Sequence, residues 1–303
     1  MHLLTALPPS DRADHWHRYV KYLHERNGAP DFTRQRFVER ERYFNNIDAK
    51  PVRRSGPPVV DQVVFSRNQA LSAPEPGLDD KTLWALCTAN INRVEDWGVR
   101  YGIALKTKQG LYHETSDQDP YHLIDLEENY HTRMLRDALE TLGLRMDDHP
   151  PRPRSQALVR AMVRMPRAVS NMMILAAEVG GVVGFQLLLV KARELFGDQP
   201  EPLARIESLF KEIIIDEIGH IRFLRSQLSS AQMMLTRLML PMVTRSFLQD
   251  LPEVVALFGR DTYLRAIDDL LAHNEIAIDD GDAHPLDRFF HPIQQQHLST
   301  SPA

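Results

Sequence analysis

Two short motifs with the same layout constrain this 303-residue chain more than any other feature. Each is an acidic residue followed by Glu-x-x-His, and they read Glu127-Glu128-Asn129-Tyr130-His131 and Asp216-Glu217-Ile218-Gly219-His220. On a helix, positions i and i+3 lie on one face, so each motif directs a carboxylate and an imidazole toward the same point. No other Glu-x-x-His occurs in the chain. The two copies therefore predict a pair of helices that meet at a shared site.

Helical patterns of apolar residues cover most of the chain from residue 79 onward, and no β pattern of comparable strength appears. Capping Asp residues, Pro at a first helical position and Gly after a helix end mark the boundaries. We therefore predict an all-α fold. The expected long helices run from Asp79 or Asp80 to about Ala104, from Pro120 to Gly143, from about Pro166 to Phe196 and from Pro200 or Pro202 to about Ser229, followed by Ala231–Phe247, Pro252–Leu257 and Asp261–His273.

The spacing of four glutamates supports two antiparallel helical hairpins. Glu95 and Glu128 are equidistant from the predicted turn between the first two long helices, and Glu178 and Glu217 are equidistant from the next predicted turn. Residues equidistant from a turn lie at the same height in an antiparallel pair. Each hairpin thus places a lone Glu level with a Glu-x-x-His motif, and this arithmetic selects Glu95 over the adjacent Asp96, which we expect on the surface.

The residues selected in this way form the ligand set of a dinuclear metal site. Carboxylates are hard ligands that can bridge two ions, and one imidazole for each ion completes such a set in a helical bundle. The spacing does not separate iron from manganese. We expect Glu128 and Glu217 to bridge, with the six ligands being Glu95, Glu128, His131, Glu178, Glu217 and His220.

The acidic residue before each motif has a separate expected role. A histidine that binds a metal usually donates its other ring N–H to a carboxylate, which fixes the tautomer and the ring orientation. We expect Asp216 to support His131 and Glu127 to support His220, each across to the other hairpin. The alternative is that both acids are ordinary exposed residues.

The segment from Ala168 to Val190 is apolar and long enough to cross a bilayer. It carries Glu178 near its middle, and a carboxylate at that depth is costly in lipid. We therefore predict the buried central helix of a soluble bundle and no membrane span. Three glycines follow Glu178, and they indicate either a cavity beside the metal site or close helix packing. These are Gly180, Gly181 and Gly184.

Composition sets the remaining expectations. A net charge of −5 gives no reason to expect nucleic acid as a partner, and the single cysteine, Cys87, suits a reducing cytoplasm. No signal peptide is visible at the N-terminus. We predict an N-terminal arm of helices and linkers over 1–78, a metal-binding bundle over 79–278 and a polar tail over 279–303. A proline-rich crossover from Leu144 to about Gln156 joins the two hairpins.

Over about residues 80–230, the ligand set and its order resemble the ferritin-like diiron oxygenase and desaturase superfamily. The sequence motifs Glu-Glu-Asn-x-His and Asp-Glu-x-x-His are similar to those of soluble acyl-carrier-protein desaturases. The general layout of the ligands along the chain is similar to that of p-aminobenzoate N-oxygenase-type enzymes. Those N-oxygenases carry an extra histidine ligand one turn before the second motif, where this chain has Ile213.

The resemblance implies a ferritin-like four-helix bundle with extra N- and C-terminal helices. It also implies two iron ions (manganese or a mixed pair is possible), dioxygen as co-substrate and a reductase or ferredoxin as electron donor. The expected activity is monooxygenation, by hydroxylation or N-oxygenation, of a small organic or carrier-bound substrate. The alternatives are an acyl desaturase and a non-catalytic metal-binding or storage protein. A homodimer through Ala231–Phe247 is a further expectation, based on its apolar surface.

Overall fold

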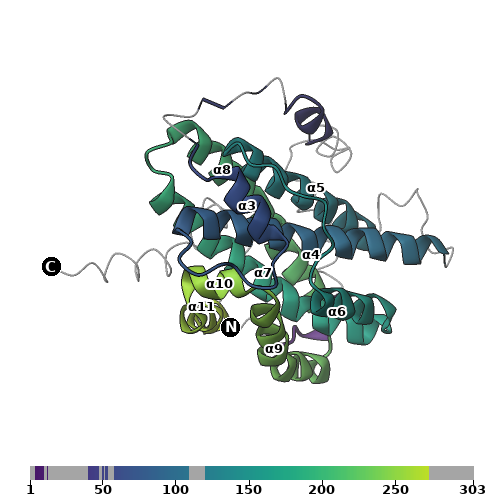
Figure 1. Ribbon diagram of the computed structural model, residues 1–303. Coiled ribbons are helices and arrows are strands. Elements are labelled where there is room, and N and C mark those ends of the chain that lie inside the picture. The colour runs from purple at the N-terminus through teal and green to yellow at the C-terminus, as the bar shows by residue number, and fades with distance from the viewer. Residues whose placement is uncertain are drawn as a thin grey trace, which may run out of the picture.

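The computed structural model describes residues 4–9, 12, 40–47, 50, 52–53, 58–108 and 120–272. Every regular element within these residues is a helix, which confirms the all-α prediction (Figure 1). The helices are α3 (Gln62–Gln69), α4 (Asp80–Lys108), α5 (Pro120–Thr141), α6 (Pro153–Arg164), α7 (Arg167–Leu195), α8 (Pro200–Gln227), α9 (Ser230–Asp250), α10 (Pro252–Phe258) and α11 (Arg260–Ala272).

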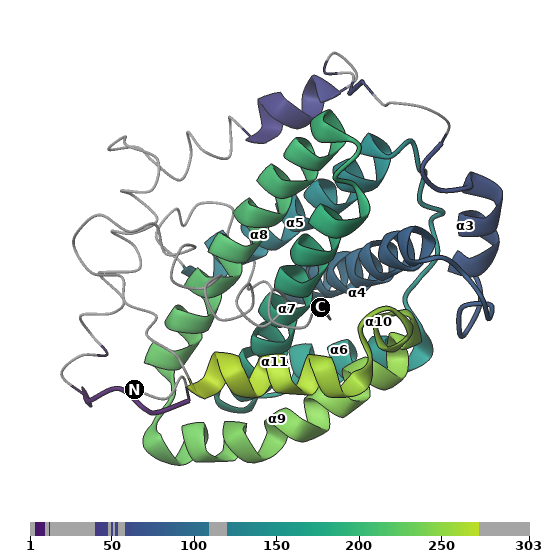
Figure 2. The ribbon, with the colours of Figure 1, turned by 90° about the vertical axis from the view of Figure 1, so that its left-hand side faces the viewer.

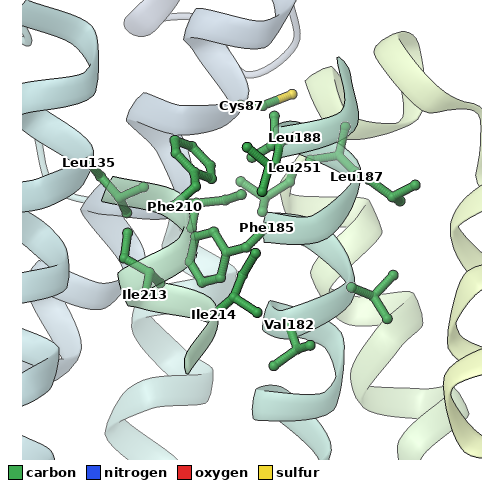
Figure 3. Packing of buried hydrophobic residues seen from close by; sticks show 14 of the residues in the cluster. Cys87, Leu135, Val182, Phe185, Leu187, Leu188, Phe210, Ile213, Ile214 and Leu251 are labelled. Carbon is green, nitrogen blue, oxygen red and sulfur yellow. The ribbon is translucent and has the colours of Figure 1, made fainter. Parts of the chain in front are cut away.

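Four long helices pack around the main core. α4 contacts α5 and α7, and α8 contacts the same two helices, so α5 and α7 each lie between α4 and α8. The core inside this arrangement is formed by branched and aromatic side chains such as Leu135, Phe185, Phe210 and Ile214 (Figure 3). Trp84 is fully buried, and its indole N–H donates to the Leu188 carbonyl over 2.8 Å, which ties α4 to α7.

The predicted boundary signals have the expected local geometry. The Asp79 carboxylate accepts hydrogen bonds from the backbone N–H and the hydroxyl of Thr82, which satisfies free donors at the start of α4. Beyond α5, Gly143 has a φ of 82°, a conformation that favours glycine. α8 has a proline in its first turn, where the missing N–H costs nothing.

The apolar helix α7 is long and apolar enough to cross a membrane by length and composition, but about two-thirds of its most apolar stretch is buried inside the protein. It packs against α4, α6, α8, α9 and α11. Neighbouring helices thus take the place that lipid would occupy around a membrane span. This arrangement is the one expected for the central helix of a soluble bundle.

Two helices at the C-terminal side, α9 and α11, cover α7. Figure 2 shows α9 and α11 running crosswise to α7 and α8. One face of α9 packs inward through buried Met233, Leu240 and Val243. The opposite face is apolar and exposed, although the homodimer expected there stays a prediction; its residues are Met234, Leu235, Leu238 and Met242.

Two helices were not predicted from the sequence. α6 begins at Pro153, inside the predicted crossover, and has this proline in its first turn. α3 lies in the predicted N-terminal arm, where the Asp61 carboxylate accepts from the N–H groups of Val63 and Val64 and Phe65 is buried. Both helices pack against α4.

The outer side of α5 is covered by residues 40–47, which belong to the predicted N-terminal arm. The ring of Phe44 stacks on Tyr130 with centroids 6.1 Å apart, and the Tyr43 hydroxyl donates to the Asp137 carboxylate. This part of the arm therefore packs on the bundle rather than standing apart from it. The tail predicted at 279–303 falls outside the described residues, and the division into three parts stays a prediction.

Candidate metal centre

The structure brings all six predicted ligands together at one height in the bundle. Each long helix supplies a part: α4 carries Glu95, α5 carries Glu128 and His131, α7 carries Glu178, and α8 carries Glu217 and His220. They form two overlapping groups, in each of which the potential ligand atoms lie within 4.8 Å of one another. The groups are Glu95 with Glu128 and His131, and Glu128 with Glu178, Glu217 and His220.

The two histidines are held from outside by the acids that the sequence paired with them. Nε2 of His131 lies 3.2 Å from Oδ2 of Asp216, and Nε2 of His220 lies 3.0 Å from Oε2 of Glu127. Because a carboxylate accepts a hydrogen bond, each Nε2 carries the proton. In the neutral imidazole, the lone pair is then on Nδ1, which faces the other carboxylates of the site.

Several atoms at the centre of the cluster are buried and make no hydrogen bond within the described chain. These include Nδ1 of both His131 and His220, which is unusual because buried polar atoms are almost always paired. His220 Nδ1 lies 3.1 Å from a Glu128 oxygen, yet the geometry is not that of a hydrogen bond. The remaining two are Oε2 of Glu95 and Oε2 of Glu217. Atoms of this kind, all potential ligands, converge where a cation would satisfy them.

Glu95 and Glu178 each have a strongly perturbed affinity for protons. Burial, and then the neighbouring charge of Glu128, raise the pKa of Glu95 well above its usual value. Burial, and then Glu217, do the same to the pKa of Glu178. Without a metal ion, both side chains are therefore favoured in the protonated form.

The pKa values of Glu128 and Glu217 are lowered, and those of the two histidines are raised. Burial opposes ionisation of Glu128 and Glu217. Contacts with the histidines nevertheless hold the pKa of Glu128 below its usual value, and contacts with Glu178 and then the histidines hold the pKa of Glu217 below its usual value. Burial likewise opposes charging of His131 and His220, but contacts with carboxylates raise the pKa of both imidazoles. Protons thus hold the cluster together where a metal ion would otherwise supply the positive charge.

Access to the cluster is uneven. The histidine side chains are fully buried and that of Glu217 is 3% exposed, whereas those of Glu128 and Glu178 are 18% and 12% exposed. Glu95 is also only partly buried, so three carboxylates are less enclosed than Glu217 and the histidines. Other neighbours along α5 and α8 are apolar and buried, among them Met134, Leu135, Ile214, Ile221 and Phe223.

One residue of the site was missed by sequence reasoning. Arg40 is buried, and its Nη2 lies 2.6 Å from Oδ2 of Asp216, the oxygen that also faces His131. Arg40 belongs to a polar segment of the predicted arm, and no local pattern points it toward a residue 176 positions away. Only the tertiary packing of residues 40–47 on the bundle reveals it.

The glycines after Glu178 make room for a tyrosine. The Tyr263 hydroxyl donates to the Gly180 carbonyl over 2.6 Å, and a Cβ on Gly180 or Gly184 would lie 3.6 or 3.5 Å from that hydroxyl oxygen. Tyr263 of α11 therefore packs against α7 at Gly180 and Gly184, which agrees with close helix packing, one of the two expectations. Gly181 would meet only Phe185, at 3.9 Å.

Other residues weighed from the sequence have ordinary surroundings. Asp96 accepts from Arg100 over 2.8 Å at the surface of α4, as expected. Ile213, at the position of the extra histidine of the N-oxygenases, is fully buried in the core.

The chain matches no protein-family model, and searches of curated proteins and of solved structures gave no match either. The function must therefore be argued from the site itself.

Proposed function

We propose that this chain is a non-haem diiron oxygenase built on a ferritin-like four-helix bundle. The observation that carries the proposal is the convergence of four unpartnered buried atoms from three helices, two ring nitrogens and two carboxylate oxygens. Support for the architecture comes from the four long helices, each of which supplies a carboxylate, while two of them also supply a histidine three residues later.

The positions of the Glu128 and Glu217 carboxylates support two metal ions rather than one. Glu128 lies 3.6 Å from Nδ1 of His131 and 3.1 Å from Nδ1 of His220. Glu217 lies 3.3 Å and 3.7 Å from the same two nitrogens. Each of these carboxylates thus has one oxygen toward each histidine, which is the placement of a bridging ligand. Glu95 and Glu178 would complete the two ends.

A redox-active role is favoured by the surroundings of the site. Iron held there would supply one-electron chemistry toward dioxygen. The protein contributes a buried apolar environment that limits water, and the side chains of Glu128 and Glu178 keep some exposure to solvent. Glu95 and Glu178, which favour the protonated form without metal, would release protons on metal binding.

Anaerobic loading with Fe²⁺ followed by exposure to dioxygen tests this proposal. We expect oxidation to stop at about two irons per chain and to be repeated when a chemical reductant is added, because one dinuclear site is present. Glu178→Gln should abolish the fast uptake of dioxygen. Accumulation of iron far beyond two per chain would favour storage instead, and bound iron that does not react with dioxygen would rule out the oxygenase.

A further inference from the structure

The two histidines of the site are supported in different electrostatic settings. On one side, Asp216 Oδ2 faces His131 Nε2 at 3.2 Å and Arg40 Nη2 at 2.6 Å. The side chains of Arg40 and Asp216 are 8% and 0% exposed, so the two charges compensate each other in a poorly solvated place. Arg40 also lies 3.6 Å from Glu212, whose side chain is largely in water.

On the other side, Glu127 has no such compensation. Its carboxylate lies 3.0 Å from Nε2 of His220 and its side chain is 3% exposed. No lysine or arginine among the described residues forms an ion pair with Glu127. A carboxylate without a cationic partner in the described part of the chain therefore supports His220, whereas a carboxylate paired with Arg40 supports His131.

The ligands themselves are shared evenly between the two halves. Glu128 and Glu217 each face both histidines. Glu95 and Glu178 add one carboxylate to each half. The charge behind each histidine, rather than the number of carboxylates, therefore favours a cation on the His220 side.

We propose that the His220 half binds a divalent metal ion before the His131 half, and that Arg40 is the positioning residue that sets this difference. Arg40 acts through Asp216: it weakens the support that this carboxylate gives to His131, and its own positive charge opposes a cation nearby. The inference rests on the metal site proposed above. It assigns the segment 40–47 a role in controlling the order of metal binding.

A titration of the metal-free full-length protein with Mn²⁺ at pH 8 tests the order of binding. Calorimetry gives the dissociation constants, and electron paramagnetic resonance separates single Mn²⁺ ions from coupled pairs. We expect two steps whose dissociation constants differ by about tenfold or more, with mainly uncoupled ions at one equivalent. Glu178→Gln should remove the tight step and Glu95→Gln the weak one. Equal affinities, with coupled pairs present from the start, would overturn the proposal.

Arg40→Met tests the assigned residue, with Arg40→Lys as the conservative variant and Tyr43→Phe as the matched control. Tyr43→Phe removes another contact of the same segment, with Asp137, and leaves Asp216 untouched. We expect Arg40→Met to lower the dissociation constant of the weak step by about threefold to tenfold. The other two variants should leave the ratio of the two dissociation constants near that of the parent. The role of Arg40 would be refuted if Arg40→Met left the ratio of the two dissociation constants unchanged or larger, or if Tyr43→Phe lowered it equally. Either result would leave the metal site intact. Failure of the parent to bind Mn²⁺ would instead refute the metal site.

Discussion

The imidazole rings of His131 and His220 lie with their centroids 5.8 Å apart, although they belong to different helical hairpins. Each ring is held by the acidic residue that precedes the other motif, Asp216 for His131 and Glu127 for His220. The two motifs therefore support each other reciprocally. This arrangement explains why an acidic residue at that position is useful in both motifs.

Replacing either supporting acid should weaken metal binding without unfolding the protein. We expect Asp216→Asn and Glu127→Gln each to raise the dissociation constant of the affected metal ion by about 10- to 100-fold, because the histidine loses its orienting acceptor. Competition with a chromophoric chelator measures the effect. Asp96→Asn, at the surface beside Glu95, is the control and should bind like the parent. Parent-like affinity in both variants would show that the acids do not act through the histidines.

The metal-free protein should lose stability as the pH rises from about 5 to 9. The pKa values of Glu95, Glu178, His131 and His220 are all raised in the folded state, so the folded state holds more protons than the unfolded chain in this range. Stability then falls with pH. Metal affinity has the opposite trend, because the ligands must release those protons.

Chemical denaturation in the presence of a chelator, repeated from about pH 5 to 9, measures whether the stability of the metal-free protein falls as the pH rises. The double variant Glu95→Gln with Glu178→Gln should be more stable than the metal-free parent at pH 8, by at least about 1 kcal/mol, since one pKa unit corresponds to about 1.4 kcal/mol. It should also show a shallower pH dependence. A metal-free parent that becomes more stable toward pH 9 would contradict this electrostatic account.

Substitution at Gly184 should separate close packing from an open cavity. A Cβ there would lie 3.5 Å from the Tyr263 hydroxyl and 3.9 Å from a ring carbon, which is ordinary contact. We expect Gly184→Ala to be nearly neutral, because the higher helix propensity of alanine offsets the tighter fit. Gly184→Leu should displace Tyr263 and cost about 1–3 kcal/mol. Thermal denaturation tests both variants, and a tolerated leucine would indicate empty space beside α7.

The ligand geometry was predictable because helical periodicity and hairpin symmetry are local rules. The interval i, i+3 places Glu128 with His131, and equal distance from a turn places Glu95 level with Glu128. The ligand role expected for Glu178 followed from its place in an apolar helix, because a charge there is costly without a partner. The same rules selected the pairing of Asp216 with His131, because residues just before a ligand lie to one side of the site.

Features that depend on tertiary packing were not predictable in this way. Arg40 reaches Asp216 only because residues 40–47 pack on α5, and nothing in the local sequence encodes that contact. The start of α6 within the crossover was not predictable, because prolines mark both loops and the first turns of helices. The role of Gly180 required Tyr263, a residue far away in the sequence, to be located first.

The most direct test of the account is the metal content of the parent and of Glu178→Ala, both purified from iron-replete medium. The account predicts about two irons per chain in the parent, because six ligands in two overlapping groups hold two ions. It also predicts that most of this iron is lost in the variant, with the helical content of the protein retained. A folded parent that contains neither iron nor manganese would contradict the central claim that this cluster is a metal centre.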